Sequence, residues 1–148
     1  MAWLEGGSPE LTQDRAFKAI ALAWADEGSE SAKRAARNVI SLQRTDGGWS
    51  QIPGTESDAY ATGQALYALH IAGKMSMTDP VFRKGIDYLL RTQAADGSWH
   101  VTSRAIWLQP YFESGFPYGQ DQFISAAGTA WASIALSVAV QPQTSVQP

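Results

Sequence analysis

The sequence QRTDGGW at residues 43–49 recurs as QAADGSW at residues 93–99, a spacing of 50 residues (93 − 43). Self-similarity at a period of a few tens of residues is typical of repeat architectures, in which each copy is one supersecondary unit. Asp-Gly and Gly-Gly form turns because Asp accepts local hydrogen bonds and Gly tolerates positive φ. Each copy therefore closes a helical stretch with a Gln, makes a polar turn, and places a Trp at a fixed distance.

The residue types in this phrase predict a structural role. A Gln at a helix end can donate from its side-chain amide to the last carbonyls of that helix. A Trp that follows the turn contributes a large apolar surface with one N–H donor. We therefore interpret Gln43, Trp49, Gln93 and Trp99 as residues that connect successive helices, in preference to a direct catalytic role.

Hydrophobic periodicity predicts an all-α chain of about five helices. In the first helix, Phe17, Ile20, Ala21 and Trp24 follow the i, i+3, i+4, i+7 pattern of an apolar face. The expected helices begin at cap-like positions, namely Ser8-Pro9, Ser31, Ser57-Asp58, Asp79-Pro80 and Asp121.

The second and fourth predicted helices carry Lys and Arg on one face, whereas the third and fifth carry no charge. A helix that is apolar all round needs a second layer of helices to cover it. The uncharged helices also resemble one another, since Thr62 and Leu69 correspond to Thr129 and Leu136 at an offset of 67. These features predict two layers built from antiparallel helical hairpins.

The stretch KGIDYLLRTQ at residues 84–93, followed by DGSW at 96–99, resembles the QW repeat of squalene and hopene cyclases and related prenyltransferase repeats. That pattern has a basic residue, Gly, an aromatic-Leu pair, Gln, Gly and Trp; the first copy keeps Arg34 but has Ala35 and Asn38-Val39 instead. The resemblance implies an α/α toroid of six hairpins. We expect this chain to form a partial toroid of about half a barrel, with one domain over residues 1–140 and a disordered tail at 141–148.

The resemblance also implies a ligand in the central cavity, near the N-termini of the inner helices. Squalene cyclases carry an acidic D-x-D-D motif there, and the corresponding stretch here is ESDAYAT at residues 56–62. Only Asp58 of the paired acids remains. It is a candidate general acid if burial raises its pKa, but an Asp at this position also acts as a helix N-cap, and we favour the cap.

A second candidate site is the insertion at residues 104–121, which is rich in aromatic and turn residues. Aromatic walls suit a polyprenoid and would stabilise a carbocation. They also suit a sugar, with Glu113 and Asp121 as the carboxylates. A third interpretation is a packed loop that caps the open end of the barrel. The proposed lining consists of Tyr60, Trp107, Tyr111, Phe112, Phe116, Tyr118 and Phe123.

The composition excludes several classes of protein. The 148 residues carry a net charge of −3 and no basic run, so a nucleic-acid partner is not expected. Without Cys, the chain lacks the zinc set of protein prenyltransferases and the thioester of complement-like domains, and we expect neither a metal nor a cofactor. The start shows no secretory signal, and the uncharged stretch from Phe123 to Val140 is expected to be a buried helix, not a membrane span; the compartment stays unassigned.

Three functions remain open from the sequence. The first is a cyclase-like domain that binds an apolar isoprenoid, with its own catalysis uncertain. The second is a non-catalytic repeat module that binds a partner or completes a larger toroid. The third is a glycan-active α/α enzyme. Because half a toroid leaves an apolar flank uncovered, we also expect a homodimer.

Overall fold

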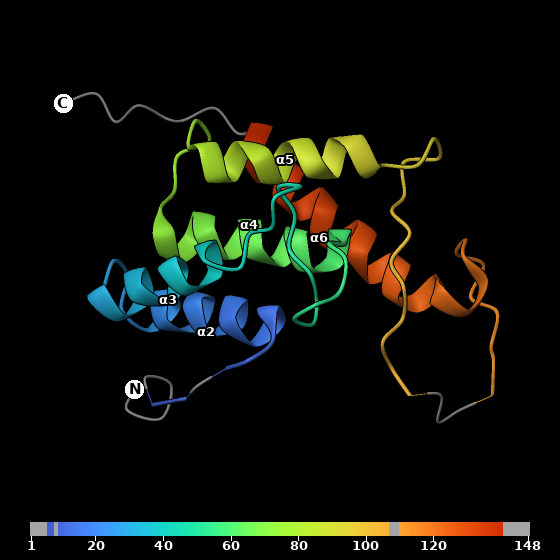
Figure 1. Ribbon diagram of the computed structural model, residues 1–148, viewed down its shortest axis with the longest axis horizontal. Helices are drawn as coiled ribbons and strands as arrows, with labels where there is room; N and C mark the ends of the chain where they lie inside the picture. The colour runs from blue at the N-terminus through green and yellow to red at the C-terminus, as the bar shows by residue number, and fades with distance from the viewer. Residues whose placement is uncertain (1–5, 8, 107–109, 141–148) are drawn as a thin grey trace.

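The computed structural model describes residues 6–7, 9–106 and 110–140 (Figure 1). This part of the chain is helical, and its one β-type pairing is an isolated bridge between Trp49 and Asp58. The all-α prediction is therefore confirmed. The helices are α2 (Thr12–Ala25), α3 (Glu30–Ile40), α4 (Ala59–Gly73), α5 (Pro80–Thr92), the 3-10 helix η1 (Gly119–Asp121) and α6 (Gln122–Val140).

Helices α2, α4 and α6 form one layer in which neighbours run parallel. The Tyr60 hydroxyl donates to Gln13 Oε1 at 2.6 Å, and Lys74 pairs with Glu27 at 2.6 Å, so the same offset of 47 residues holds at both ends of α2 and α4. Gly63 lies against Trp131 and Gly128 against Tyr60, which gives a constant offset of 68 between α4 and α6. Figure 1 shows all three running in one direction.

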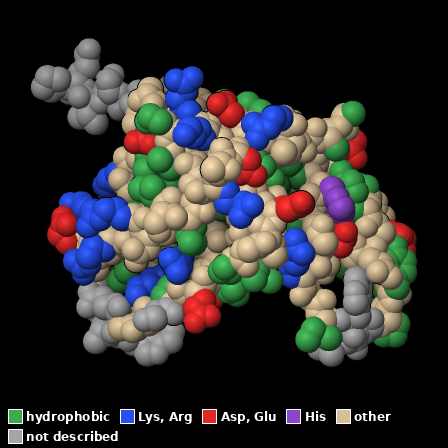
Figure 2. Space-filling model, in the orientation of Figure 1, with side chains coloured by type: hydrophobic (Ala, Val, Ile, Leu, Met, Phe, Trp, Pro, Cys, Tyr) green, Lys and Arg blue, Asp and Glu red, His purple; other side chains and the backbone are tan. Residues whose placement is uncertain are grey.

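Helices α3 and α5 form a second layer and run in the opposite direction (Figure 1). Helix α3 packs against α2 and α4, and α5 packs against α4 and α6. Lys and Arg side chains gather over these two helices (Figure 2). The arrangement of two layers of antiparallel hairpins is consistent with part of an α/α toroid, and α4 lies at its centre because it contacts every other α-helix.

The two Trp residues of the repeat make the same contacts 50 residues apart. Both indoles are buried, and their Nε1 atoms donate to Val39 O at 2.8 Å and to Leu89 O at 2.9 Å. These carbonyls belong to the end of the preceding outer helix, where intrahelical partners run out. Val39 O also accepts from Leu42 N–H at 3.1 Å, and Leu89 O from the Thr92 hydroxyl at 3.3 Å. The Trp backbone N–H groups donate to Thr62 and Thr129, both at 3.0 Å. Each Trp thus ties the end of an outer helix to the next inner helix.

The Gln residues of the repeat hold the turn, and Gln43 also makes the predicted connection to a following helix. Gln43 Nε2 donates to Gly47 O at 3.0 Å and to Val81 O of α5 at 2.8 Å, and Gln93 Nε2 donates to Gly97 O at 2.9 Å. They close the turn, where Gly47 and Gly97 both have φ near +90° (89° and 86°). Neither amide donates to the last carbonyls of its own helix, so that expectation is wrong, whereas the bond from Gln43 to Val81 O does connect two helices.

The predicted start and the predicted buried face of the first helix are also corrected. Helix α2 begins at Thr12, not at Pro9, and buries Ala16, Ala19, Ile20 and Ala23. Phe17 and Trp24 are 44% and 73% exposed, because small residues let α2 pack closely between α3 and α4 while the aromatic side chains stay on the opposite face.

Helix α6 is buried on one side only. An 18-residue window within Gly119–Val140 has a mean hydropathy of 1.7, and 28% of that window is buried. By length and composition alone this helix could cross a membrane. In the described residues α4, α5 and η1 pack against α6, and Phe17 of α2 contacts Trp131, while Phe123 and Ile134 are 58% and 40% exposed. The expectation of a fully buried helix therefore holds for α4 and fails for α6.

Candidate functional site

Asp58 lies at the N-terminal end of α4 and caps it. Its Oδ1 accepts from Ala61 N–H at 2.9 Å, and its Oδ2 accepts from Gln51 Nε2 at 3.0 Å. Both oxygens of the carboxyl are thus engaged, as is usual for an Asp in the N-cap position. The side chain is largely buried, at 9% exposure.

Burial makes ionisation of Asp58 less favourable than it is in water. Burial raises the pKa of Asp58, and the hydrogen bonds from Ala61 and Gln51 only partly offset this effect. The phenol of Tyr88 donates to Ser57 O at 2.6 Å, and burial followed by the nearby Asp58 charge raises the pKa of Tyr88 to about 12. A carboxyl with a raised pKa can donate a proton, but this one is not accompanied by a second acid.

A pocket of about 230 Å³ opens beside this cap, at the N-terminal ends of α2 and α4. Gln51 lies in its wall and is also the residue that bonds to Asp58. Its lining mixes apolar side chains with three carboxamides and one guanidinium: Leu11, Gln13, Gln51, Ile52, Tyr60, Ala61, Gln64 and Arg104.

The insertion does not provide the predicted aromatic lining. Of the predicted residues, Tyr60 alone lines this pocket. Tyr111, Phe112 and Phe123 are between 50% and 70% exposed, and Trp107 lies outside the described residues. Phe116 and Tyr118 contact each other, with ring centroids 6.4 Å apart, and Tyr118 also packs on His100 at 4.9 Å. The structure therefore does not bring the predicted aromatic residues together around one cavity.

The two carboxylates predicted in the insertion are engaged locally. Glu113 accepts from the Tyr111 hydroxyl, which lowers the pKa of Glu113. Asp121 accepts from Ser103 N–H and pairs with His100, both at 2.8 Å. Burial would raise the pKa of Asp121, but these hydrogen bonds outweigh it and the net shift is downward. Asp121 ends η1, directly before α6, and holds the insertion against it.

A group of aromatic residues that sequence reasoning missed lies on the layer of parallel helices. Phe17 of α2 meets Trp131 of α6 edge-on at 5.8 Å, and Tyr67 of α4 lies 6.0 Å from Trp131. We call Phe17, Tyr67 and Trp131 the aromatic face. The repeat offsets do not reveal it, because the spacings of 47 and 67 lead from Phe17 to Gln64 and then to Trp131, and so miss Tyr67.

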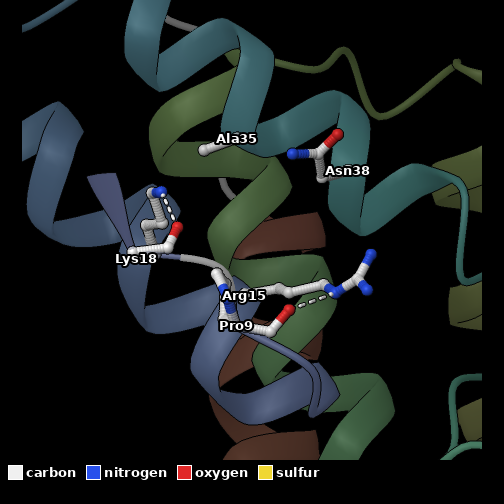
Figure 3. A pocket seen from close by; sticks show the side chains of 6 residues that line it. Pro9, Arg15, Lys18, Ala35 and Asn38 are labelled. Carbon is white, nitrogen blue, oxygen red and sulfur yellow. Dashed lines mark hydrogen bonds between the residues drawn. The ribbon is translucent and has the colours of Figure 1, made fainter. Parts of the chain in front are cut away.

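A second pocket, of about 270 Å³, lies where the N-terminal segment crosses α2 and α3 (Figure 3). Arg15 Nε donates to Pro9 O at 3.1 Å and Lys18 Nζ to Gly7 O at 2.6 Å. These bonds attach the N-terminal segment to α2, so the basic groups there have a structural task. Among the described residues no group of three or more His, Asp or Glu side chains could hold a metal ion.

Comparison with known proteins identifies relatives over most of the chain. Residues 10–147 match the family described as the squalene-hopene cyclase C-terminal domain. Lanosterol synthase of Saccharomyces cerevisiae is 34% identical over 104 residues, or 70% of this chain. Squalene–hopene cyclase of Zymomonas mobilis is 30% identical over 60% of the chain, and lanosterol synthase of Aspergillus fumigatus is 31% identical over 80%. The chain spans 13% to 16% of the length of these relatives.

Proposed function

Because this chain belongs to the squalene-hopene cyclase C-terminal domain family, we propose that it binds an apolar isoprenoid and does not cyclise it on its own. The main observation in support of this proposal is the aromatic face. Phe17, Tyr67 and Trp131 come from three different helices, meet ring to ring, and keep part of their surface accessible. Contiguous aromatic surface on a rigid helical layer suits an unbranched or branched hydrocarbon chain.

The relatives support an isoprenoid as the ligand class. They are named as lanosterol synthases and a squalene–hopene cyclase, and a further one, from Streptantibioticus cattleyicolor, is a drimenyl diphosphate synthase that is 34% identical over 45% of this chain. An aromatic surface of this kind would also stabilise a positively charged intermediate through cation–π contact. The glycan-active alternative receives no support from these relatives.

We expect no cyclisation because the carboxyl of Asp58 is held by hydrogen bonds within the protein. Protonating an alkene or an epoxide needs an acid whose proton points at the ligand, but both oxygens of Asp58 are used within the protein, on Ala61 N–H and Gln51 Nε2. No second carboxyl stands in the stretch at 56–62 except Glu56, which is exposed. A single capping carboxyl is a poor source of the proton.

Binding and turnover are tested separately. Squalene presented in detergent micelles should quench the tryptophan fluorescence saturably in the wild type and much less in Trp131→Ala, while Trp24→Ala, which removes an exposed Trp outside the aromatic face, keeps saturable quenching. Product analysis after incubation should show unchanged squalene. A cyclic product that disappears in Asp58→Asn would overturn the non-catalytic part of the proposal, and the absence of saturable binding would overturn the ligand class.

A further inference from the structure

Gln64 is buried in α4, and its side-chain amide has no partner. The residue is 1% exposed, and neither Oε1 nor Nε2 makes a hydrogen bond within the described part of the chain. Gln122 in α6 is an instructive contrast because it is also fully buried. Its Oε1 accepts from Ser114 N–H and its Nε2 donates to Phe112 O at 2.7 Å. Buried amides are normally satisfied in this way, so an unsatisfied one is a place where a water molecule or a ligand can supply the partner.

Gln64 is one of the residues that line the 230 Å³ pocket. From these two observations we infer that the pocket receives the terminal hydroxyl of an isoprenoid alcohol and that Gln64 anchors it. This inference rests on the proposed function, because it assigns the polar end of the same ligand. Tyr67 lies one helical turn beyond Gln64 and contacts Trp131, so a chain that leaves the pocket would reach the aromatic face.

The chemistry of the pocket favours a hydroxyl over an anion. A hydroxyl both donates and accepts, so it can pair with Gln64 Oε1 and Nε2 together, whereas a phosphate oxygen only accepts. Gln13 and Gln51 add two more neutral amides, which already bond to Tyr60 and Asp58. The Asp58 carboxyl, 3.0 Å from Gln51 Nε2, opposes a negative ligand. Arg104 supplies the one cation of the lining, and its side chain is exposed at the rim.

The size of the pocket agrees with a head group rather than a whole chain. Pockets that enclose drug-sized ligands have volumes of about 300–1,000 Å³. A volume of about 230 Å³ is enough for a hydroxyl and its first isoprene unit. The remaining chain must then lie outside, where the exposed aromatic surface is available.

The test compares three ligands with the same chain: farnesol, the hydrocarbon farnesene and farnesyl diphosphate. We expect the wild type to bind farnesol about tenfold or more tightly than farnesene, since each 1.4 kcal/mol of selective hydrogen bonding corresponds to a factor of ten. In Gln64→Leu the preference should fall to about one while farnesene affinity is retained. Arg104→Gln, a change at the rim of the same pocket, should leave farnesol affinity within about twofold.

Equal affinity for farnesol and farnesene in the wild type, or a preference that survives in Gln64→Leu, would overturn the inference. Tighter binding of the diphosphate, lost in Arg104→Gln, would reassign the pocket to anions and overturn it as well. Either result leaves the proposed function standing, because a farnesyl chain still binds.

A second measurement separates the pocket from the chain-binding face. Prenol, which has a single isoprene unit, should shift the side-chain amide resonances of Gln64 in ¹⁵N-edited spectra, and 2-methyl-2-butene should not. This titration needs no substitution, so it holds even if Gln64→Leu fails to fold. If prenol shifts Gln64 and no long isoprenoid binds, the proposed function fails and the hydroxyl site remains. If prenol leaves Gln64 unchanged, the hydroxyl site fails.

Discussion

At the scale of single residues, the indole nitrogens of Trp49 and Trp99 determine how the layers are connected. Each donates to a carbonyl ten residues earlier, at 2.8 and 2.9 Å, and each ring is at most 2% exposed. Gly85 allows the first ring to lie close, since a Cβ there would be 3.0 Å from the Trp49 ring and 2.7 Å from Leu66. The Gly of the repeat is therefore a packing requirement.

We expect Trp99→Ala to lower the free energy of unfolding by about 3–5 kcal/mol, because it leaves a cavity and removes the donor to Leu89 O. Trp99→Phe keeps most of the apolar volume but not the N–H, so it should cost less than the Ala variant. Urea unfolding followed by circular dichroism measures both. An Ala variant with the midpoint of the wild type would contradict the structural role.

The raised pKa of Asp58 predicts how the stability of the fold depends on pH. Since its folded pKa is raised above the unfolded value near 3.8, the folded state holds its proton more tightly. Its contribution to stability is therefore most favourable below pH 3.8 and is lost as the pH rises through the folded pKa. The wild type should lose stability over this window relative to Asp58→Asn, which keeps an N-cap acceptor.

The cap itself is tested with Asp58→Ala. Loss of a capping acceptor costs about 0.5–2 kcal/mol, so this variant should be less stable than Asp58→Asn at every pH. Thermal unfolding of the two variants in parallel from pH 3 to 8 checks both statements. A constant difference between the wild type and Asp58→Asn across this range would refute the raised pKa.

At the scale of helices, Gly63 sets the distance between α4 and α6. A Cβ on Gly63 would lie 2.5 Å from the carbonyl carbon of Trp131, and one on Gly128 would lie 2.6 Å from Val101 Cγ2. The first clash is with backbone, so no side-chain rotation relieves it. The two helices pack at this distance because Gly63 lacks a side chain. At Gly128 the close neighbour is Val101, and the nearest α4 atom, Tyr60 N, would lie 3.4 Å from an added Cβ.

Gly63→Ala should therefore be destabilising by about 1–3 kcal/mol through overpacking, although Ala is the better helix former. Gly73→Ala is the matched control, because its Cβ would find only Ala36 at 3.4 Å and Met75 at 4.0 Å. That variant should be neutral or slightly more stable. Thermal unfolding distinguishes the two, and equal midpoints would contradict the close approach.

The starts of the helices could be predicted from the sequence, but their buried faces could not all be predicted. Asp58, Asp79 and the repeated turn identified the starts of α4 and α5 because capping and turn formation depend on a few neighbouring residues. The buried face of α2 could not be found in this way, because Phe17 and Trp24 have the spacing of an apolar face and only the neighbouring helices decide which side is covered. Gln64 was missed for the same reason: its burial depends on how three helices pack.

For the molecule as a whole, a prominent exposed apolar feature is the uncovered side of α6. Phe123 and Ile134 are 58% and 40% exposed on that side, and Ala130 and Ser137 share it. The prediction of a homodimer, made from the sequence, remains a prediction, and this side of α6 is the surface that would be used.

Light scattering on the purified chain should give the mass of a dimer, and Ala130→Glu should give a monomer, because it places a charge at the centre of the uncovered side. Leu90→Glu is the control, since it adds the same charge at an exposed apolar position on α5 and should leave the dimer intact. A monomeric wild type at high concentration would contradict the prediction.

The connection made by each Trp has a consequence for the order in which the chain folds. Its indole bond spans only ten residues, from Trp49 to Val39 and from Trp99 to Leu89. Contacts so close in sequence form before distant ones, so each helix and its turn should assemble first and then add to their neighbours, as in other repeat proteins. Helix α6 buries fewer of its residues than α4, and its amide hydrogens should therefore exchange with solvent sooner than those of α4.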